Sequence, residues 1–296
     1  MTYARNGMQH VLDLGTCRDH TTGRAPPQRF GPIVSADGSR VATVRSSGTG
    51  RSAKQTIWIT DRLSGKAHAV FSETQYYRTI GPGETLGPIV LLGWGGDRWI
   101  FFTIDPGGSG SIQADGLTLR VVSARGGPAR RLAKMLVYRD YLAWCGGRLV
   151  FTAGMDRVAT NTKRLLVASP PDWKPRPLVV APGRAWGSVA CGPDARSVVV
   201  QTQRQSNNPM FFATRWSLWR VGLDGSRSVL DTPPPVWADE SPRWSPDGRS
   251  LLFVRERKGH GWLWLWHDGH ASGPLAPLGY SIGYYGHHDW PFTWLG

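Results

Sequence analysis

The chain repeats one pattern, a tight turn followed by an apolar run, at intervals of roughly 50 residues. The clearest copy is Trp244–Val254, which reads WSPDGRSLLFV, and weaker copies begin near Ser35, Gly93, Ala143 and Cys191. A repeat of this length is one supersecondary unit that buries its apolar faces only against neighbouring units. The sequence therefore predicts an array of similar units along the whole chain.

Each unit contains the signals of four short strands. After the turn and its apolar strand come a polar loop and another apolar run, such as LWRVG from Leu218 or LWLWH from Leu263. A second tight turn, such as Asp224-Gly225, leads into the last strand. Asp-Gly turns supply the positive φ angles that tight hairpins need, so each unit is expected to be an antiparallel four-stranded blade.

The two ends of the chain complement each other. Residues 1–28 read as the second, third and fourth strands of a blade, and residues 281–296 read as a first strand. We therefore predict an all-β, six-bladed β-propeller of four-stranded antiparallel blades, closed by pairing of the N-terminal strands with the C-terminal strand. The expected single domain, 1–296, has a shared blade (281–296 plus 1–28) and blades at about 29–74, 75–134, 135–184, 185–234 and 235–280.

The segment Trp244–Gly248, followed by LLFV and LWLW, resembles the WD40-like PD40 repeat of TolB-type propellers. The resemblance implies the fold and leaves the function open. Propellers of this type include envelope scaffold proteins, the propeller halves of prolyl oligopeptidases and some polysaccharide lyases. No G-x-S-x-G nucleophile motif for a hydrolase domain follows here.

The chain carries 35 basic and 21 acidic residues, a formal net charge of +14. A nucleic-acid surface would gather this charge in one stripe. Basic residues instead recur at or next to the turn of each repeat, as at Arg40, Arg148 and Arg249. We therefore expect a solvated basic surface and no nucleic-acid partner, and polyanion binding is a second alternative.

The three cysteines lie in neither a CxxC motif nor a Cys/His metal spacing. We therefore predict no cofactor and no resident metal. No segment approaches the roughly 18 apolar residues of a membrane span. The first 30 residues lack a basic region followed by an apolar stretch, which predicts a cytoplasmic protein, or an exported, periplasmic one if Met1 replaces a removed leader.

Aromatic and charged residues fall in the loops expected at one face of the propeller, around the mouth of its channel. A scaffold that binds a protein or peptide partner through this face and its long loops, without catalysis, is the leading hypothesis; a small molecule in the channel is an alternative ligand. The predicted partner-binding residues are Tyr76, Tyr77, Arg78, Tyr141, Trp186, Trp237, Phe211, Phe212, Tyr284 and Tyr285.

The segment Tyr284–Trp290 also supports an alternative, a lyase or hydrolase with a site in the funnel. A histidine oriented by a carboxylate can act as a general base or as a metal ligand, so the reaction could be metal-assisted. The candidate catalytic residues are His287, His288, Asp289, Asp239 and Glu240. If the segment is a strand, His287 and Asp289 share one side and His288 takes the other. The competing interpretation is that these side chains only hydrogen-bond the backbone where the ring closes.

The alternation of Trp262, Trp264 and Trp266 looks like a binding stripe. Aromatic residues with this spacing on a blade strand normally pack against the next blade. We therefore expect these three rings to be core residues.

Overall fold

The computed structural model describes residues 1–16, 18–24, 31–48, 54–74, 89–105, 111–207, 215–283 and 285–294. Within these ranges the strands form six four-stranded antiparallel sheets, the blades of a six-bladed β-propeller. The helices described are two short 3-10 turns, Ile112–Ala114 and Arg139–Tyr141. None of the helices in the described ranges is long and apolar enough to cross a membrane.

The chain divides into two compact units. Unit 1 comprises Met1–Gln28, Val158–Leu165 and Pro177–Gly296, and unit 2 comprises Arg29–Arg157 and Leu166–Arg176. Unit 2 holds the sheet of β4 (Ile33–Val34), β5 (Arg40–Ser47), β6 (Lys54–Asp61) and β7 (Ala67–Thr74). It also holds the sheet of β8 (Ile89–Gly95), β9 (Trp99–Ile104), β10 (Leu117–Ser123) and β11 (Arg130–Met135).

A further sheet is formed by β12 (Leu142–Cys145), β13 (Arg148–Ala153), β14 (Arg164–Ala168) and β15 (Arg176–Pro177). Unit 1 contains β16 (Arg184–Cys191), β17 (Ser197–Arg204), β18 (Ser217–Gly222) and β19 (Arg227–Asp231) as one sheet. The next sheet is β20 (Ala238–Trp244), β21 (Ser250–Arg257), β22 (His260–His267) and β23 (His270–Tyr280).

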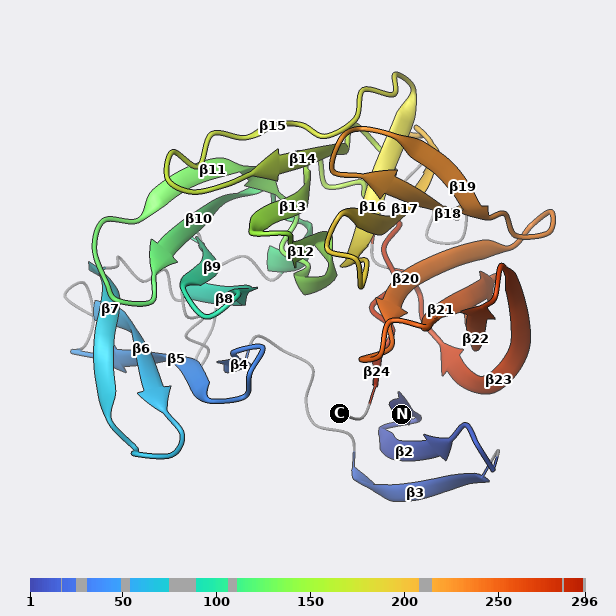
Figure 1. The fold of residues 1–296 in the computed structure, drawn as a ribbon, viewed down its shortest axis with the longest axis horizontal. Helices are drawn as coiled ribbons and strands as arrows, with labels where there is room; N and C mark the ends of the chain where they lie inside the picture. The colour runs from blue at the N-terminus through green and yellow to red at the C-terminus, as the bar shows by residue number, and fades with distance from the viewer. Residues whose placement is uncertain are drawn as a thin grey trace. The chain divides into compact units, whose positions relative to one another are not determined.

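The last sheet joins the two ends of the chain. Its order is β24 (Phe292–Thr293), β1 (Thr2–Arg5), β2 (Met8–Asp13) and β3 (Arg18–Arg24). Thr2 pairs with Thr293 and Tyr3 with Phe292, antiparallel, and the Ala4 N–H donates to the Pro291 carbonyl at 2.8 Å. The predicted pairing of an N-terminal strand with the C-terminal strand is confirmed, and β24 lies beside the N-terminus in Figure 1.

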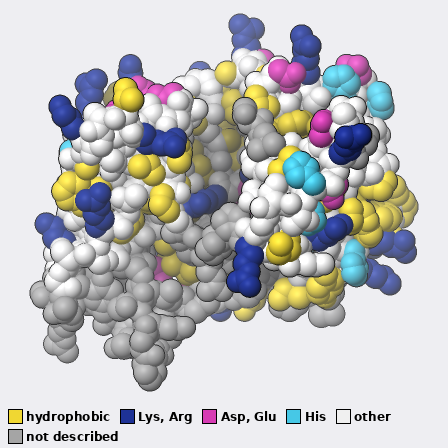
Figure 2. Space-filling view, turned by 90° about the horizontal axis from the view of Figure 1, so that it is seen from below, with side chains coloured by type: hydrophobic (Ala, Val, Ile, Leu, Met, Phe, Trp, Pro, Cys, Tyr) yellow, Lys and Arg dark blue, Asp and Glu magenta, His cyan; other side chains and the backbone are white. Residues whose placement is uncertain are grey.

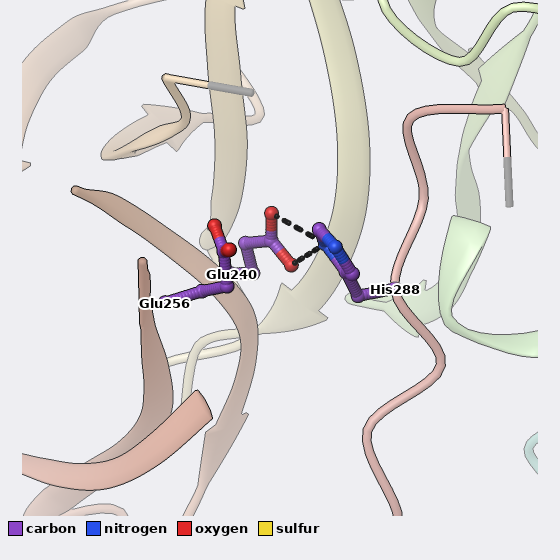
Figure 3. Close-up of side chains that lie close together, drawn as sticks. All are labelled: Glu240, Glu256 and His288. Carbon is purple, nitrogen blue, oxygen red and sulfur yellow. Dashed lines mark hydrogen bonds and ion pairs between the residues drawn. The ribbon is translucent and has the colours of Figure 1, made fainter. Parts of the chain in front are cut away.

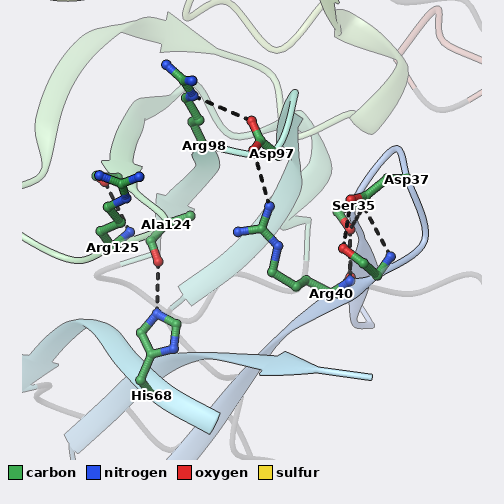
Figure 4. A network of polar contacts seen from close by, with 10 residues as sticks. Ser35, Asp37, Arg40, His68, Asp97, Arg98, Ala124 and Arg125 are labelled. Carbon is green, nitrogen blue, oxygen red and sulfur yellow. Dashed lines mark hydrogen bonds and ion pairs between the residues drawn. The ribbon is translucent and has the colours of Figure 1, made fainter. Parts of the chain in front are cut away.

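The repeated turn is held by a hydrogen-bond pattern that its sequence encodes. In unit 2 the Ser35 hydroxyl donates to Asp37 at 2.6 Å, and the Arg40 N–H donates to the Ser35 hydroxyl at 2.9 Å (Figure 4). The same two bonds recur in unit 1, from Ser245 to Asp247 at 2.6 Å and from the Ser250 N–H at 3.0 Å. The hydroxyls of Ser35 and Ser39 and the Ser39 N–H, which all donate to Asp37, lower the pKa of that carboxyl to about 2.

The second strand of one blade, β21, alternates its side chains between two neighbouring sheets of unit 1. On β21, Leu252 and Val254 belong to a buried cluster with Tyr3 and Trp290, which connects this sheet to the terminal one. The other face of β21 packs on the preceding sheet, where Leu251 and Phe253 contact Val199 and Leu218. Two-sided burial explains why the second strand of this blade is a continuous apolar run.

Trp290 packs so closely on β22 that it leaves room only for a glycine. A Cβ atom built on Gly261 would lie 2.6 to 2.9 Å from three atoms of the Trp290 ring. We predict that Gly261→Ala destabilises the protein by about 1–3 kcal/mol, because the ring must move out of a filled core. Thermal unfolding of the full chain measures this effect.

Gly15→Ala is the matched control, because its Cβ atom would meet only Asp13 at an ordinary distance of 3.4 Å. It should change the free energy of unfolding by less than about 0.5 kcal/mol. Equal stabilities of the two variants would contradict the packing of the C-terminal segment on β22.

Candidate functional site

The paired strands β20 and β21 place ionisable side chains on both faces of one blade. Ala238 pairs with Glu256 and Glu240 with Val254, so Glu240 and Glu256 are diagonal neighbours on the same face. Asp239 pairs with Arg255 on the opposite face. The two strands therefore carry two separate polar groups, one with Glu240 and Glu256 and the other with Asp239 and Arg255.

A β-bulge in β20 sets the direction of Glu240. The register shifts between Glu240 and Arg243, and Ser241 adopts the left-handed conformation with φ of 52°. The Ser241 N–H donates to the side-chain oxygen of Gln201 on β17 at 3.0 Å, which compensates for the lost ladder bond. Bulges of this kind re-aim side chains, and here the bulge follows directly after the site residue.

Glu240, Glu256 and His288 form what we call the carboxylate–histidine cluster (Figure 3). His288 Nδ1 lies 3.2 and 3.0 Å from the two carboxylate oxygens of Glu240. The Trp290 indole N–H donates to the same carboxylate at 3.0 Å, and the Gly259 N–H donates to Glu256. One ligand atom from each of the three side chains lies within 4.8 Å of the others, and all three residues are buried.

The electrostatics of the cluster favour an ion pair. Burial is the largest single effect on both groups and opposes their ionisation, but the attraction of nearby charges and the hydrogen bonds together outweigh it. The pKa of Glu240 is consequently lowered by His288 and by the Trp290 hydrogen bond. The pKa of His288 is raised by the Glu240 carboxylate, with Glu256 adding to the effect. Both shifts favour the charged forms of Glu240 and His288.

The opposite face of the blade holds a second ion pair. Arg255 donates to both oxygens of Asp239, at 2.7 and 2.9 Å, and to Asp231 at 2.7 Å. Burial raises the pKa of Asp239 to about 7, although the hydrogen bonds from Arg255 favour the charged form. Both oxygens of Asp239 thus accept hydrogen bonds from Arg255 on β21. Because Arg255 also donates to Asp231 on β19, this group links β19, β20 and β21.

The segment before β24 departs from the strand expected there. Residues 285 and 286 form a turn, so the period-two alternation of a strand does not govern His287, His288 and Asp289. Both histidines are buried and Asp289 is exposed. Of the five predicted catalytic residues, the structure brings Glu240 and His288 into direct contact.

The predicted partner-binding residues divide into three groups. Trp237 and Tyr285 are half-buried, with part of each ring at the surface. Tyr141 and Trp186 are buried, with their rings 5.1 Å from Tyr138 and 6.2 Å from Trp219 respectively, measured between centroids. The remaining six lie outside the described residues: Tyr76, Tyr77, Arg78, Phe211, Phe212 and Tyr284.

An aromatic surface lies at the end of the same blade, at the turn between β21 and β22. We call Trp237, His260, Trp262 and Tyr280 the aromatic ridge. Its ring centroids are 5.4 Å apart for Trp237 and Trp262, 6.3 Å for His260 and Trp262, and 5.2 Å for His260 and Tyr280. The Arg257 guanidinium lies over the Trp237 ring at 5.6 Å.

The three tryptophans of β22 have different surroundings. Trp264 and Trp266 pack against the cluster that contains Leu251 and Phe253, as expected for core residues. Trp262 instead contacts Trp237 in the ridge. The sequence pattern did not distinguish Trp262 from the other two because all three share one face of the strand.

Sequence reasoning missed Glu256 and Trp290 as members of the polar group. A usable signal was present, because a hairpin centred on the turn at Ser245–Ser250 brings residues near 239 and 240 opposite residues near 255. The register itself was not readable, since the bulge at Ser241 shifts the pairing by one residue.

Comparisons with known proteins agree on the fold. No protein-family model matches the sequence, and no curated protein matches it significantly. Among solved structures, TolB from Acinetobacter baumannii is 13% identical with a TM-score of 0.53, and the match covers 90% of this chain and 60% of that chain. The chain therefore spans less than two thirds of that TolB.

Two further structures extend the comparison. The TolB-type protein of Agrobacterium tumefaciens is 13% identical with a TM-score of 0.54, covering 96% of this chain and 93% of that chain. An acylaminoacyl peptidase from Pyrococcus horikoshii is 12% identical with a TM-score of 0.51, covering 95% of this chain and 46% of that chain. TolB proteins and a peptidase share this architecture, so the comparisons decide the fold alone. The chain has the fold of the TolB-like β-propellers.

Proposed function

We propose that the protein is a non-catalytic propeller scaffold that binds a peptide segment of a partner protein on its aromatic ridge. The observation that carries the proposal is the run of ring contacts from Trp237 through Trp262 and His260 to Tyr280. Interface hot spots are enriched in Trp, Tyr and Arg, and the ridge combines all three with Arg257.

Exposed apolar side chains extend the ridge. Val236 is 57% exposed, and Tyr280 and Ile282 are each 56% exposed. They come from the loop before β20 and from the end of β23, which are the segments that carry Trp237 and Tyr280. Exposed apolar side chains gathered on neighbouring segments are typical of partner-binding sites.

Charge indicates the chemistry of the partner. Arg257 and Lys258 lie at the turn beside the ridge, and the chain as a whole carries a net charge of +14. A peptide that presents an aromatic or aliphatic side chain next to acidic residues would bury its apolar group on the rings. Its carboxylates would then face these cations, which adds specificity and speeds association.

The peptide is expected to dock through its side chains rather than by adding a strand. The outer strand of this blade, β23, contains Pro274 and Pro277, which lack the N–H groups that a pairing strand would need. The aromatic rings therefore supply the binding surface, and the sheet edge does not.

The enzyme alternative is less well supported by the described residues. A general base must come within hydrogen-bonding reach of its substrate. Glu240, Glu256 and His288 are each at most 2% exposed, so a substrate has no access to them in this conformation. We therefore place the function on the ridge rather than on the buried cluster.

We predict that the ridge selects acidic peptides with an aromatic or aliphatic anchor from a displayed peptide library. Tyr280→Ala should weaken binding of the selected peptides about tenfold or more, because loss of an interface aromatic anchor typically costs 2 kcal/mol or above. Affinities measured by titration calorimetry test this prediction.

The control variant is Leu63→Ala, which removes another exposed side chain, 98% exposed, from unit 2. It should leave peptide affinity unchanged. Selected peptides that bind the Tyr280 variant as tightly as the unmodified protein would refute the ridge as the binding surface.

Polyanion binding is the other alternative. Figure 2 shows Lys and Arg side chains spread over the visible face of the molecule, with no single basic stripe. We predict that affinity for heparin or duplex DNA is weak at physiological salt and that no ordered stretch of phosphates is neutralised.

The measurement is the salt dependence of binding between 50 and about 200 mM salt. A shallow loss of affinity is expected if few anionic groups are contacted. A loss of a thousandfold or more would identify a polyanion site and contradict this prediction.

A further inference from the structure

We propose that Glu240, Glu256 and His288 form a binding site for a divalent transition-metal ion. The proposal concerns the buried carboxylate–histidine cluster and is independent of peptide binding on the ridge. It departs from the sequence-based prediction of no resident metal. That prediction was made without Glu256, which was not among the candidate residues.

The donor atoms are already gathered at close to metal-binding distances. One oxygen or nitrogen from each residue lies within 4.8 Å of the other two. Ligands bound to one zinc ion at about 2.0–2.2 Å are themselves about 3–3.5 Å apart. The three side chains would therefore close around the ion by shifts of roughly 1 Å, without rearrangement of the strands that carry them.

The charge of the cluster leaves a place for a cation. Two carboxylates and an imidazole are gathered in a site removed from solvent. A divalent cation balances the charge of two carboxylates, and carboxylate and imidazole are both regular ligands of such ions.

The hydrogen bonding of His288 provides an independent observation. Its Nε2 atom is buried and has no hydrogen-bond partner among the described residues. Buried polar atoms are normally paired, and each exception requires an explanation. The other ring nitrogen, Nδ1, contacts the Glu240 carboxylate at 3.0 Å, and the Trp290 ring stacks on the imidazole at 5.5 Å between centroids, so the ring is already oriented.

Neighbouring groups already orient the carboxylates. The Trp290 indole holds one oxygen of Glu240, and the Gly259 N–H holds one oxygen of Glu256. Such outer contacts are a regular part of metal sites. The site would also join β20 and β21 to the segment that leads into β24 (Figure 3).

The donor set selects the class of metal. One imidazole and two carboxylates suit Zn²⁺ or Mn²⁺, whereas Ca²⁺ requires six or more oxygen ligands. Three protein ligands with water in the fourth position are a common zinc arrangement. Zn²⁺ is the first probe because it binds nitrogen-containing sites more tightly than Mn²⁺.

The test is titration of Zn²⁺ into the full chain after treatment with a chelator, followed by calorimetry and by thermal unfolding. One equivalent should bind saturably and raise the unfolding temperature, because the ion binds only the folded arrangement. Glu256→Gln should lower Zn²⁺ affinity at least tenfold, while its amide oxygen can still accept from the Gly259 N–H. Glu240→Gln should act in the same direction and retain an acceptor for Trp290.

Glu73→Gln on β7 is the matched control, since it removes one carboxylate from a residue outside the cluster. It should bind Zn²⁺ like the unmodified protein. Absence of saturable binding of both Zn²⁺ and Mn²⁺ would overturn the site. Binding that Glu256→Gln and Glu240→Gln leave unchanged would overturn it equally, by assigning the ion to other surface ligands.

Discussion

The pairing of the chain's two ends in one sheet is the constraint on which the polar site depends. β24 has only two residues, and a strand this short at a chain end would fray without a partner. The pairing with Thr2 and Tyr3 and the bond from Ala4 to Pro291 fix the C-terminal segment in unit 1. Once that segment is fixed, His288 and Trp290 are held against Glu240.

The repeated turn made the strands of each blade predictable. A serine two residues before an aspartate closes the turn at Ser35 and again at Ser245, with the same two hydrogen bonds. Because these bonds are local, residues two to five positions apart determine them, and a single sequence contains all of that information. The same argument holds for the apolar strand that follows, whose two buried faces give it an uninterrupted apolar pattern.

The site was only partly predictable, for reasons that concern distance along the chain and register. Glu240 and His288 were both candidates, but 48 positions separate them and no local pattern pairs them. Glu256 escaped notice because a bulge at Ser241 decides which residues of β20 and β21 share a face. The turn at residues 285 and 286 likewise removed the strand alternation on which the assignment of His287 and Asp289 rested.

The buried cluster and the exposed ridge meet at one hairpin turn, the turn between β21 and β22. Glu256 accepts the N–H of Gly259, the residue before His260, and the Gly259 carbonyl accepts the N–H of Ser281, the residue after Tyr280. The polar core of the blade therefore fixes the backbone from which two ridge side chains project. Side chains that are already ordered lose less conformational entropy when a partner binds. Burying charged groups in this blade costs free energy, and the same groups keep the proposed recognition surface rigid.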